Sequence, residues 1–153
     1  MRKERTFFFI KPDAIQRNLC SEIYHRLIAK NIAIIHFDTI VVDIPTICEH
    51  YKHIILKFGS WAQQAFINYY CGRKILIYIL ECHNAITLTR KIVGYCDPCM
   101  AEKGTIRGDF GIDSMKEALK QHRICNNLVH ASDSAQSADY ESMLWLKKGV
   151  YEF

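Results

Sequence analysis

The sequence predicts an α/β fold in which one sheet is covered by helices. Two observations point to this class: some segments repeat apolar residues at the spacing of strands and others at the spacing of helices, and the two kinds alternate along the chain. A chain of 153 residues, of which 50% are hydrophobic, can bury its own core, so we expect a single domain over residues 1–153. Periodicity alone leaves the topology open between a ferredoxin-like antiparallel sheet and a small doubly wound sheet.

The first half of the chain contains three segments of strand character. They are residues 7–10, 32–42 and 74–80. The last of them is nearly all apolar, so we expect it to be buried on both faces of the sheet. Helical spacing lies between the strands: Ile23, Leu27 and Ile28 mark one helix, and the apolar positions from Trp61 to Tyr70 mark another.

The second half begins with a helix that Asn84 is suited to cap and that ends near Gly94. From Tyr95 to Ile112 the periodicity stops, and a loop of this length is usually functional. The remaining predicted elements are a helix from Ser114 to about His122 with a capping-box pattern, a strand over residues 124–129 and a helix over residues 134–145.

Charge and cysteine content narrow the class of protein and its compartment. The net charge of +4 suits an anionic ligand and is too small to require nucleic acid as a partner. Seven cysteines, an odd number and mostly in apolar runs, favour a reducing compartment. The apolar run at residues 6–10 is too short for a signal peptide or a bilayer span, so we expect a soluble protein of the cytosol or nucleus, assigned to the cytoplasm, with no membrane partner.

Two segments offer positive charge to an anion. Lys11 follows the first strand and precedes a rigid Pro12, so it is held where it can reach a phosphate, although such a lysine alone is more often a solvated strand end. The segment 104–110 places Arg107 among small residues, where backbone amides can approach an anion and the guanidinium can bind it bidentately. Gly-rich nucleotide fingerprints are absent, so any nucleotide is bound in another way.

The densest polar cluster covers residues 127–134. A short apolar strand delivers Asn127 and His130 to the corner before the last helix. A lone histidine is more often a surface residue, but Ser132 and Glu141 can orient this one. A carboxylate bonded to one ring nitrogen fixes the tautomer and leaves the other nitrogen as a nucleophile.

These motifs, taken in order, resemble the nucleoside diphosphate kinase family. The matching segments are residues 10–14, 49–51, 104–110 and 127–134. The matches run from about Arg5 to Trp145, which is nearly the whole chain. The resemblance implies a ferredoxin-like α/β (α+β) sandwich with a mainly antiparallel four-stranded sheet covered by helices, and so decides the topology that periodicity leaves open.

The resemblance also implies a kinase that transfers the γ-phosphoryl group of a nucleoside triphosphate, typically ATP, to a nucleoside diphosphate by a ping-pong mechanism through a phosphohistidine. The catalytic residues would be His130, Lys11, Glu141, Ser132 and Tyr51. The nucleotide-binding residues would be Lys11, Trp61, Arg90, Cys96, Arg107 and Asn127. The cofactor would be Mg²⁺, bound mainly through the nucleotide phosphates and without a metal site of protein ligands.

The nucleobase would stack on Trp61, with Phe58 as the alternative, unless Trp61 is simply a core residue. Cys96 stands where the family usually has a threonine that touches phosphate. The stretch before Asn127 is longer than usual, which indicates an insertion at about residues 111–125 in a region that packs against neighbouring subunits in the family. We expect a homo-oligomer, with a hexamer favoured over a tetramer or dimer.

Two other functions are open from the sequence. A catalytically silent nucleotide-binding or scaffolding member of the family would be expected to have lost His130, Lys11 or Arg107, and all three are present. A nucleic-acid-binding module ranks last, because the chain lacks a basic stripe and an aromatic RNA-binding motif.

Overall fold

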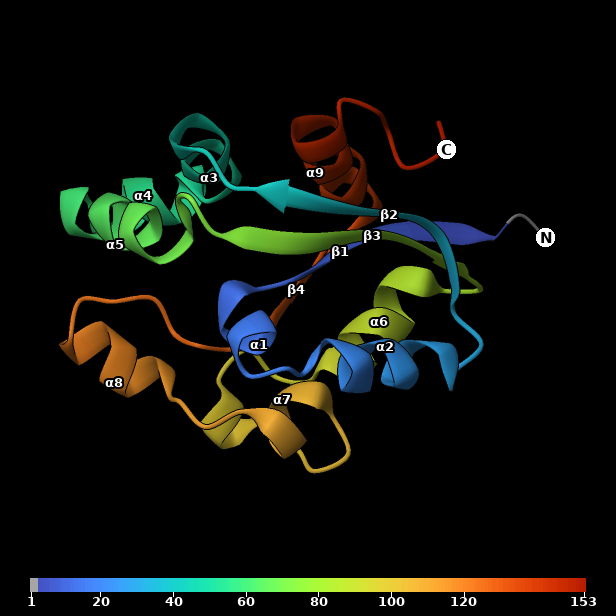
Figure 1. The fold of residues 1–153 in the computed structure, drawn as a ribbon, viewed down its shortest axis with the longest axis horizontal. Coiled ribbons are helices and arrows are strands. Elements are labelled where there is room, and N and C mark those ends of the chain that lie inside the picture. The colour runs from blue at the N-terminus through green and yellow to red at the C-terminus, as the bar shows by residue number, and fades with distance from the viewer. Residues whose placement is uncertain (1–2) are drawn as a thin grey trace.

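The computed structural model describes residues 3–153. Its centre is a four-stranded sheet in the order β2-β3-β1-β4, in which neighbouring strands are antiparallel (Figure 1). The strands are β1 (Glu4–Ile10), β2 (Ala33–Val41), β3 (Lys74–Cys82) and β4 (Val129–Ala131). The predicted ferredoxin-like antiparallel sheet is therefore confirmed.

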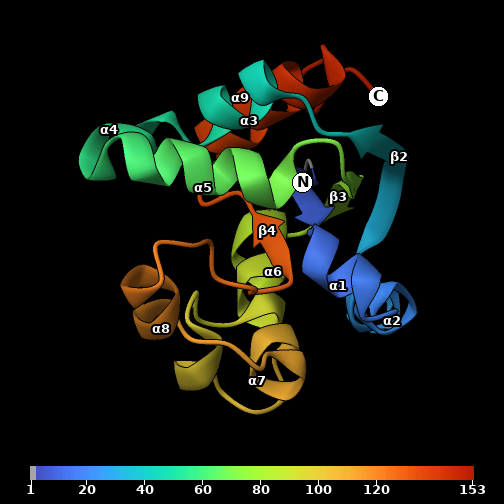
Figure 2. The same ribbon diagram turned by 60° about the vertical axis from the view of Figure 1, so that its left-hand side comes forward.

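Helices cover both faces of this sheet, as Figures 1 and 2 show from two directions. One group contains α3 (Ile44–His50), α4 (Lys52–Phe58), α5 (Ser60–Tyr70) and α9 (Ala135–Leu146). The other contains α1 (Pro12–Gln16), α2 (Cys20–Ile28), α6 (Ala85–Val93), the 3₁₀ helix η1 (Pro98–Met100), α7 (Ile106–Phe110) and α8 (Met115–Lys120). In the part of the chain that is described, no helix is both long and apolar enough to cross a lipid bilayer.

The central strand β1 contributes side chains to two hydrophobic cores, one on each face of the sheet. Because side chains alternate between the faces of a strand, Phe7 and Phe9 enter the core under α3, α5 and α9, whereas Phe8 and Ile10 enter the core under α2 and α6. The neighbouring strand β3 is buried from Ile77 to Leu80, in agreement with the burial that its apolar run predicts. His130 pairs with Phe9 across the sheet and so belongs to the first of these faces.

The predicted boundaries are wrong in the segment before the last helix. Residues 124–128 do not form a strand, and β4 begins only at Val129. The reason is Leu128, whose φ of 74° is left-handed and cannot continue an extended strand. His130 therefore lies within β4 and not at the corner that follows it.

The long segment from Tyr95 to Ile112 is also more regular than its sequence suggests. It contains η1 and α7, and Arg107 lies in the first turn of α7 rather than in an open glycine-rich loop. Thr105 makes this start possible, because its hydroxyl accepts a hydrogen bond from the Gly108 amide at 3.0 Å.

The predicted helix caps have mixed outcomes. Ser114 caps α8 as predicted, because its hydroxyl accepts a hydrogen bond from the backbone amide of Glu117 at 3.1 Å. Ser134, predicted only as the start of the last helix, caps α9 by accepting from the amide of Ser137 at 3.0 Å. Asn84 does stand before α6, but its backbone is left-handed and its side chain makes no capping bond. A carboxylate from β1 takes that role, since Glu4 Oε2 accepts from the amide of Ile86 at 2.8 Å.

Candidate active site

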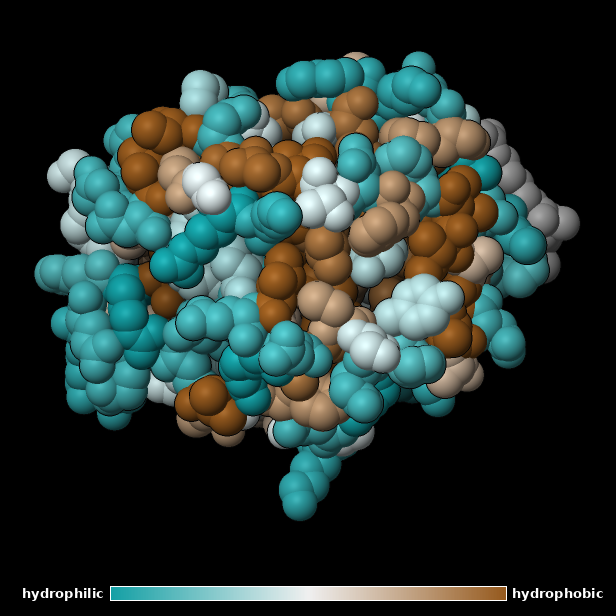
Figure 3. All heavy atoms as spheres, viewed as in Figure 1, coloured by the Kyte–Doolittle hydropathy of each residue, from teal (hydrophilic) through white to brown (hydrophobic). Residues whose placement is uncertain are grey.

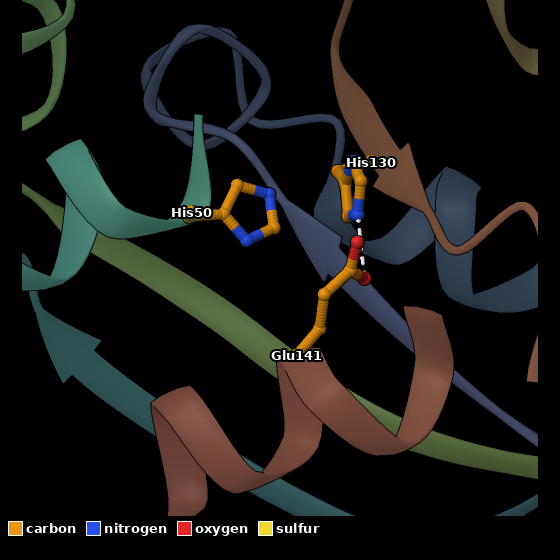
Figure 4. A group of neighbouring side chains, drawn as sticks. All are labelled: His50, His130 and Glu141. Atoms are coloured by element: carbon orange, nitrogen blue, oxygen red, sulfur yellow. Dashed lines mark hydrogen bonds and ion pairs between the residues drawn. The ribbon is translucent and has the colours of Figure 1, made fainter. Parts of the chain in front are cut away.

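A histidine held by a carboxylate lies at the junction of β4 and α9. The Nε2 atom of His130 lies 2.8 Å from Oε2 of Glu141, and the hydroxyl of Ser132 donates to the same oxygen at 2.5 Å. Figure 4 shows the His130 and Glu141 side chains pointing toward one another, with the dashed line marking their contact. The carboxylate fixes the proton on Nε2, so Nδ1 is the ring nitrogen that keeps an available lone pair. His130 and Ser132 therefore both contact Glu141, as expected from the sequence.

Aromatic rings fix the plane of His130 from two further sides. Its ring stacks on Phe9 at a centroid distance of 4.9 Å and lies edge to face with His50 at 4.7 Å. The indole of Trp145 donates to Nδ1 of His50 at 3.1 Å. Burial, with a smaller contribution from His130, holds the pKa of His50 well below its usual range, so His50 is a neutral support for the reactive ring.

The role of His50 is not predicted from the sequence, in which its position beside Tyr51 in the matching segment 49–51 is the one signal that points to it. The ligand atoms of His50, His130 and Glu141 lie within 4.8 Å of one another, close enough for a metal ion. This set is rich in imidazole, whereas Mg²⁺ prefers oxygen ligands and phosphates.

Lys11 projects from the end of β1 into the base of the site. Only 4% of its surface is exposed, and its ammonium donates to Oδ1 of Asn127 at 2.7 Å and to the carbonyl of Cys125 at 3.1 Å. Burial lowers the pKa of Lys11 to about 8, an effect that Asp13 opposes and Arg107 reinforces. An ammonium has three donors, so one is left for a ligand.

A buried carboxylate orders the backbone beside Asn127. Asp13 accepts from the hydroxyl of Tyr69 at 2.5 Å and from the amide of Leu128 at 3.2 Å. The second bond supports the left-handed conformation of Leu128, which a bulky side chain rarely adopts without such support. Asp13 and Tyr69 thereby hold the backbone next to Asn127, and the sequence alone gives no sign of this support.

Two arginines bring positive charge to His130. The Arg107 guanidinium donates to the carbonyls of Asn127 (3.0 Å), Gly94 (3.2 Å) and Val129 (2.7 Å). A guanidinium has five N–H donors, so two stay available on the half-buried side chain of Arg107. Arg90, on the last turn of α6, is exposed and contacts the carbonyl of Ala131 at 3.5 Å.

Tyr51 and Cys96 complete the wall near these arginines. The Tyr51 ring stacks on Phe66 at 4.2 Å, and its hydroxyl lies 3.0 Å from that of Tyr70. Burial raises the pKa of Tyr51, so its hydroxyl stays protonated and can donate. The carbonyl of Cys96 accepts from the side-chain amide of Asn127 at 3.0 Å, which places Cys96 at the site even though it carries no hydroxyl.

Two cavities meet at His130. The first, of about 450 Å³, is lined by Arg90, Arg107 and Glu141, and the second, of about 650 Å³, runs from Lys11 and Asn127 to Phe58 and Trp61. Tyr51, Cys96, Arg107 and His130 line both cavities. The site therefore joins a cationic end to an apolar end, with the histidine between them. Trp61 is half-buried and lines the second cavity, which favours a binding role over a core role, and Phe58 lies beside it.

Transfer of a phosphoryl group requires positive charge around its oxygens and a nucleophile in line with it. The fold and this cleft define a phosphotransferase built on a ferredoxin-like sheet. The family model described as nucleoside diphosphate kinase matches residues 4–150, and the chain belongs to that family of enzymes.

Relatives from distant organisms agree with this assignment. The chain is 36% identical over 147 residues to nucleoside diphosphate kinase 1 of Glycine max, covering 95% of this chain and 89% of the relative. It is 34% identical over 146 residues to the nucleoside diphosphate kinase of Methanocaldococcus jannaschii, covering 95% of each chain. The solved structure of the Borrelia burgdorferi enzyme, a transition-state mimic with vanadate and ADP, is similar with a TM-score of 0.87 at 25% identity, covering 94% of this chain and 86% of that chain.

Proposed function

We propose that the protein transfers the γ-phosphoryl group of a nucleoside triphosphate, typically ATP, to a nucleoside diphosphate through a phosphohistidine on His130. The observation that carries this proposal is the contact between Nε2 of His130 and Glu141, which leaves Nδ1 as the nucleophile beside Arg90 and Arg107. The similar Borrelia burgdorferi structure, which holds ADP and vanadate, supports the same chemistry for this cleft.

The reaction proceeds in two displacements at the transferred phosphorus atom. In the first, the Nδ1 lone pair of His130 forms a bond to the γ-phosphorus while the bond from that phosphorus to the bridging oxygen breaks, and the nucleoside diphosphate leaves. In the second, a terminal phosphate oxygen of another nucleoside diphosphate attacks the phosphohistidine, and the N–P bond breaks. Glu141 stabilises the positive charge that the ring gains, and Ser132 holds Glu141 in position.

The remaining side chains bind the nucleotide. Arg90 and the two unused donors of Arg107 contact the phosphate oxygens, with the Tyr51 hydroxyl beside them. Lys11 and Asn127, already bonded to one another, contact the ribose hydroxyls and the phosphates. Cys96 contributes its backbone and a thiol where a hydroxyl would have donated.

Mg²⁺ accompanies the nucleotide in this proposal. The one group of possible metal ligands found among the described residues, His50, His130 and Glu141, offers mainly imidazole nitrogens, which Mg²⁺ does not prefer, so in this proposal the ion is held mainly by phosphate oxygens and water. When bound, it supplies additional positive charge to the phosphates.

The proposed compartment is the cytoplasm. All seven cysteines of the chain are free thiols, which is typical of proteins in a reducing compartment: Cys20, Cys48, Cys71, Cys82, Cys96, Cys99 and Cys125.

The proposal is tested by intact mass after mixing the protein with ATP and Mg²⁺. We expect the mass to increase by one acid-labile phosphoryl group, because the first half-reaction forms the phosphohistidine. GDP should then remove this group with formation of GTP, because the second half-reaction consumes the phosphohistidine. No mass gain and no GTP from folded, nucleotide-binding protein would favour the catalytically silent member instead.

Nucleotide affinity is expected to fall in alkaline solution because of Lys11. Its pKa of about 8 in the free protein means that the ammonium is charged at neutral pH and loses its proton as the pH rises. A bound phosphate stabilises the charged form, so the dissociation constant for ADP should rise by about 30-fold from about pH 7 to pH 9.5. Titration calorimetry measures this. Lys11→Arg keeps its charge over that range and should flatten the profile, whereas an equal pH dependence in both proteins contradicts the assignment.

We also propose that the chain forms a homo-oligomer, with a hexamer favoured over a tetramer or dimer. The strand β2 lies at the sheet edge, and Phe37 and Val41 on it are 52% and 58% exposed. Figure 3 shows hydrophobic residues gathered on the face that β2 crosses in Figure 1. An open, apolar edge strand favours pairing with another chain.

Sedimentation velocity should give a mass several times that of the 17.8 kDa chain. Val41→Lys should shift the distribution toward smaller species, because it places a charge on the edge. A wild-type protein that is monomeric at every concentration would contradict the proposal.

A further inference from the structure

A buried tyrosine behind the cleft contacts the tyrosine that lines it. Tyr70 is the last residue of α5 and is fully buried, and its hydroxyl lies 3.0 Å from that of Tyr51, which separates α3 from α4. Helices α3 and α5 pack together, as Figure 2 shows. Tyr51 lines both cavities, whereas Tyr70 is not among the described residues that form their walls. The Tyr70 hydroxyl can therefore act on a ligand in the cleft only through Tyr51.

The burial of Tyr70 decides which of the two hydroxyls is the donor. A buried O–H group without an acceptor costs free energy, and within residues 3–153 the Tyr51 oxygen is the one acceptor that the Tyr70 hydroxyl contacts. Tyr70 therefore donates to Tyr51. Burial raises the pKa of both phenols, and their hydrogen bond adds to the rise for Tyr70 and opposes it for Tyr51, as expected when Tyr70 is the donor.

The ring of Tyr51 is held at its face and at its edge. It stacks on Phe66 at a centroid distance of 4.2 Å and lies edge to face with His50 at 4.5 Å. Because the ring is held, the hydroxyl oxygen is held with it, and rotation of the O–H group is the freedom that remains. A phenol O–H lies near the ring plane in one of two directions, and the hydrogen that Tyr70 donates excludes the direction facing Tyr70. The Tyr51 proton therefore points away from Tyr70.

The direction away from Tyr70 is open to the cleft, because Tyr51 borders both cavities together with Arg107. Burial has the largest effect on the pKa of Tyr51, and the charges that also act on it are Glu141, which raises it, and Arg107, which lowers it. A neutral donor beside a guanidinium suits an anionic oxygen. A donor that already has its direction before the ligand arrives needs no reorganisation on binding.

We propose that Tyr70 is a positioning residue, which donates to Tyr51 and so directs the Tyr51 proton at the phosphate oxygens of the nucleotide. This inference rests on the proposed function, in which the Tyr51 hydroxyl lies beside those oxygens. The bond from Tyr70 contributes in two ways. It sets the direction of the Tyr51 proton, and it makes the Tyr51 hydroxyl a stronger donor, because consecutive hydrogen bonds polarise one another.

The experiment is a double-mutant cycle of Tyr70→Phe and Tyr51→Phe, measured by titration calorimetry with ADP and Mg²⁺. Tyr70→Phe keeps the ring and removes the hydroxyl, so we expect about threefold weaker ADP binding from the lost direction and polarisation. Tyr51→Phe removes the donor itself and should weaken binding by about tenfold. In the Tyr51→Phe background, Tyr70→Phe should have no further effect on binding, because no proton is left to direct.

Urea denaturation of the same proteins tests the direction of the hydrogen bond. Tyr51→Phe leaves the buried Tyr70 O–H without an acceptor, so this variant should be less stable than Tyr70→Phe, and the double variant should recover part of the loss. The matched control is Tyr78→Phe, since Tyr78 is a buried tyrosine of the other core and is not described in either cavity wall. It should leave ADP binding unchanged. Tyr70→Met also lacks the hydroxyl and replaces Tyr70→Phe if that protein does not fold.

Two outcomes overturn the inference. One is an equal loss of ADP affinity from Tyr70→Phe in both backgrounds, which shows a merely structural role, and the other is no loss in the wild-type background. Intact-mass phosphorylation with ATP separates this from the proposed function. Variants that take up the phosphoryl group but show no coupling in the cycle refute the role of Tyr70 alone, whereas a wild type that is never phosphorylated refutes the kinase mechanism.

Discussion

Replacing His130 by alanine is expected to reduce phosphoryl transfer by about 10⁴-fold or more, because the variant has no atom on which the intermediate can form. Nucleotide binding should change little, since the nucleotide contacts proposed for Lys11, Arg107 and Asn127, which line the same cavity, do not involve the imidazole ring. A coupled assay of GTP formation from ATP and GDP measures the first quantity, and calorimetry with ADP measures the second.

The matched control is His25→Ala, which removes an exposed histidine from α2. It should leave the rate unchanged. Substantial activity in the His130→Ala protein, with an acid-labile phosphoryl group on another residue, would contradict the assignment of the nucleophile.

The second large effect concerns stability as well as catalysis. Arg107→Met is expected to lower the free energy of unfolding by about 3 kcal/mol, because three backbone carbonyls that now accept from one half-buried guanidinium would lose their donor. Activity should fall further than the loss of stability explains, since the two Arg107 donors proposed to bind phosphate disappear too. Urea denaturation measures the stability change.

Two comparisons make this result interpretable. Arg107→Lys keeps the charge but cannot reproduce three separated hydrogen bonds, so its stability should lie between those of the wild type and Arg107→Met. Arg73→Met removes an exposed arginine just before β3 and should have an effect near zero. Equal stabilities for Arg73→Met and Arg107→Met would show that the carbonyl contacts contribute little.

The core of the fold was predictable because its pattern is local. The run from Ile75 to Leu80 identifies a central strand, and Ser114 and Ser134 mark the starts of their helices by their own side chains. The extent of β4 was not predictable in this way. It depends on Leu128, whose backbone is held by a carboxylate 115 residues earlier in the chain, at Asp13.

In the candidate site too, some residues could be predicted from the sequence and others could not. His130, Ser132 and Glu141 could be grouped because they lie close together in sequence, around the last strand and the last helix, and the structure places both His130 and Ser132 in contact with Glu141. Other pairs hold the residues that pack against His130, such as the hydrogen bond from Trp145 to His50, and they join residues far apart in sequence. Each partner alone resembles an ordinary core residue, so no local signal distinguishes it.

The position of β1 between β3 and β4 has a consequence for how the protein matures during synthesis. Arg5 pairs with Glu81 and Phe9 with His130, so the first strand made by the ribosome receives its second partner only when most of the chain has emerged. Glu141 follows later still. Such distant pairing slows folding. The complete cleft therefore forms only after the last helix has been made, and a nucleotide that needs His130 and the residues around it stabilises the finished molecule.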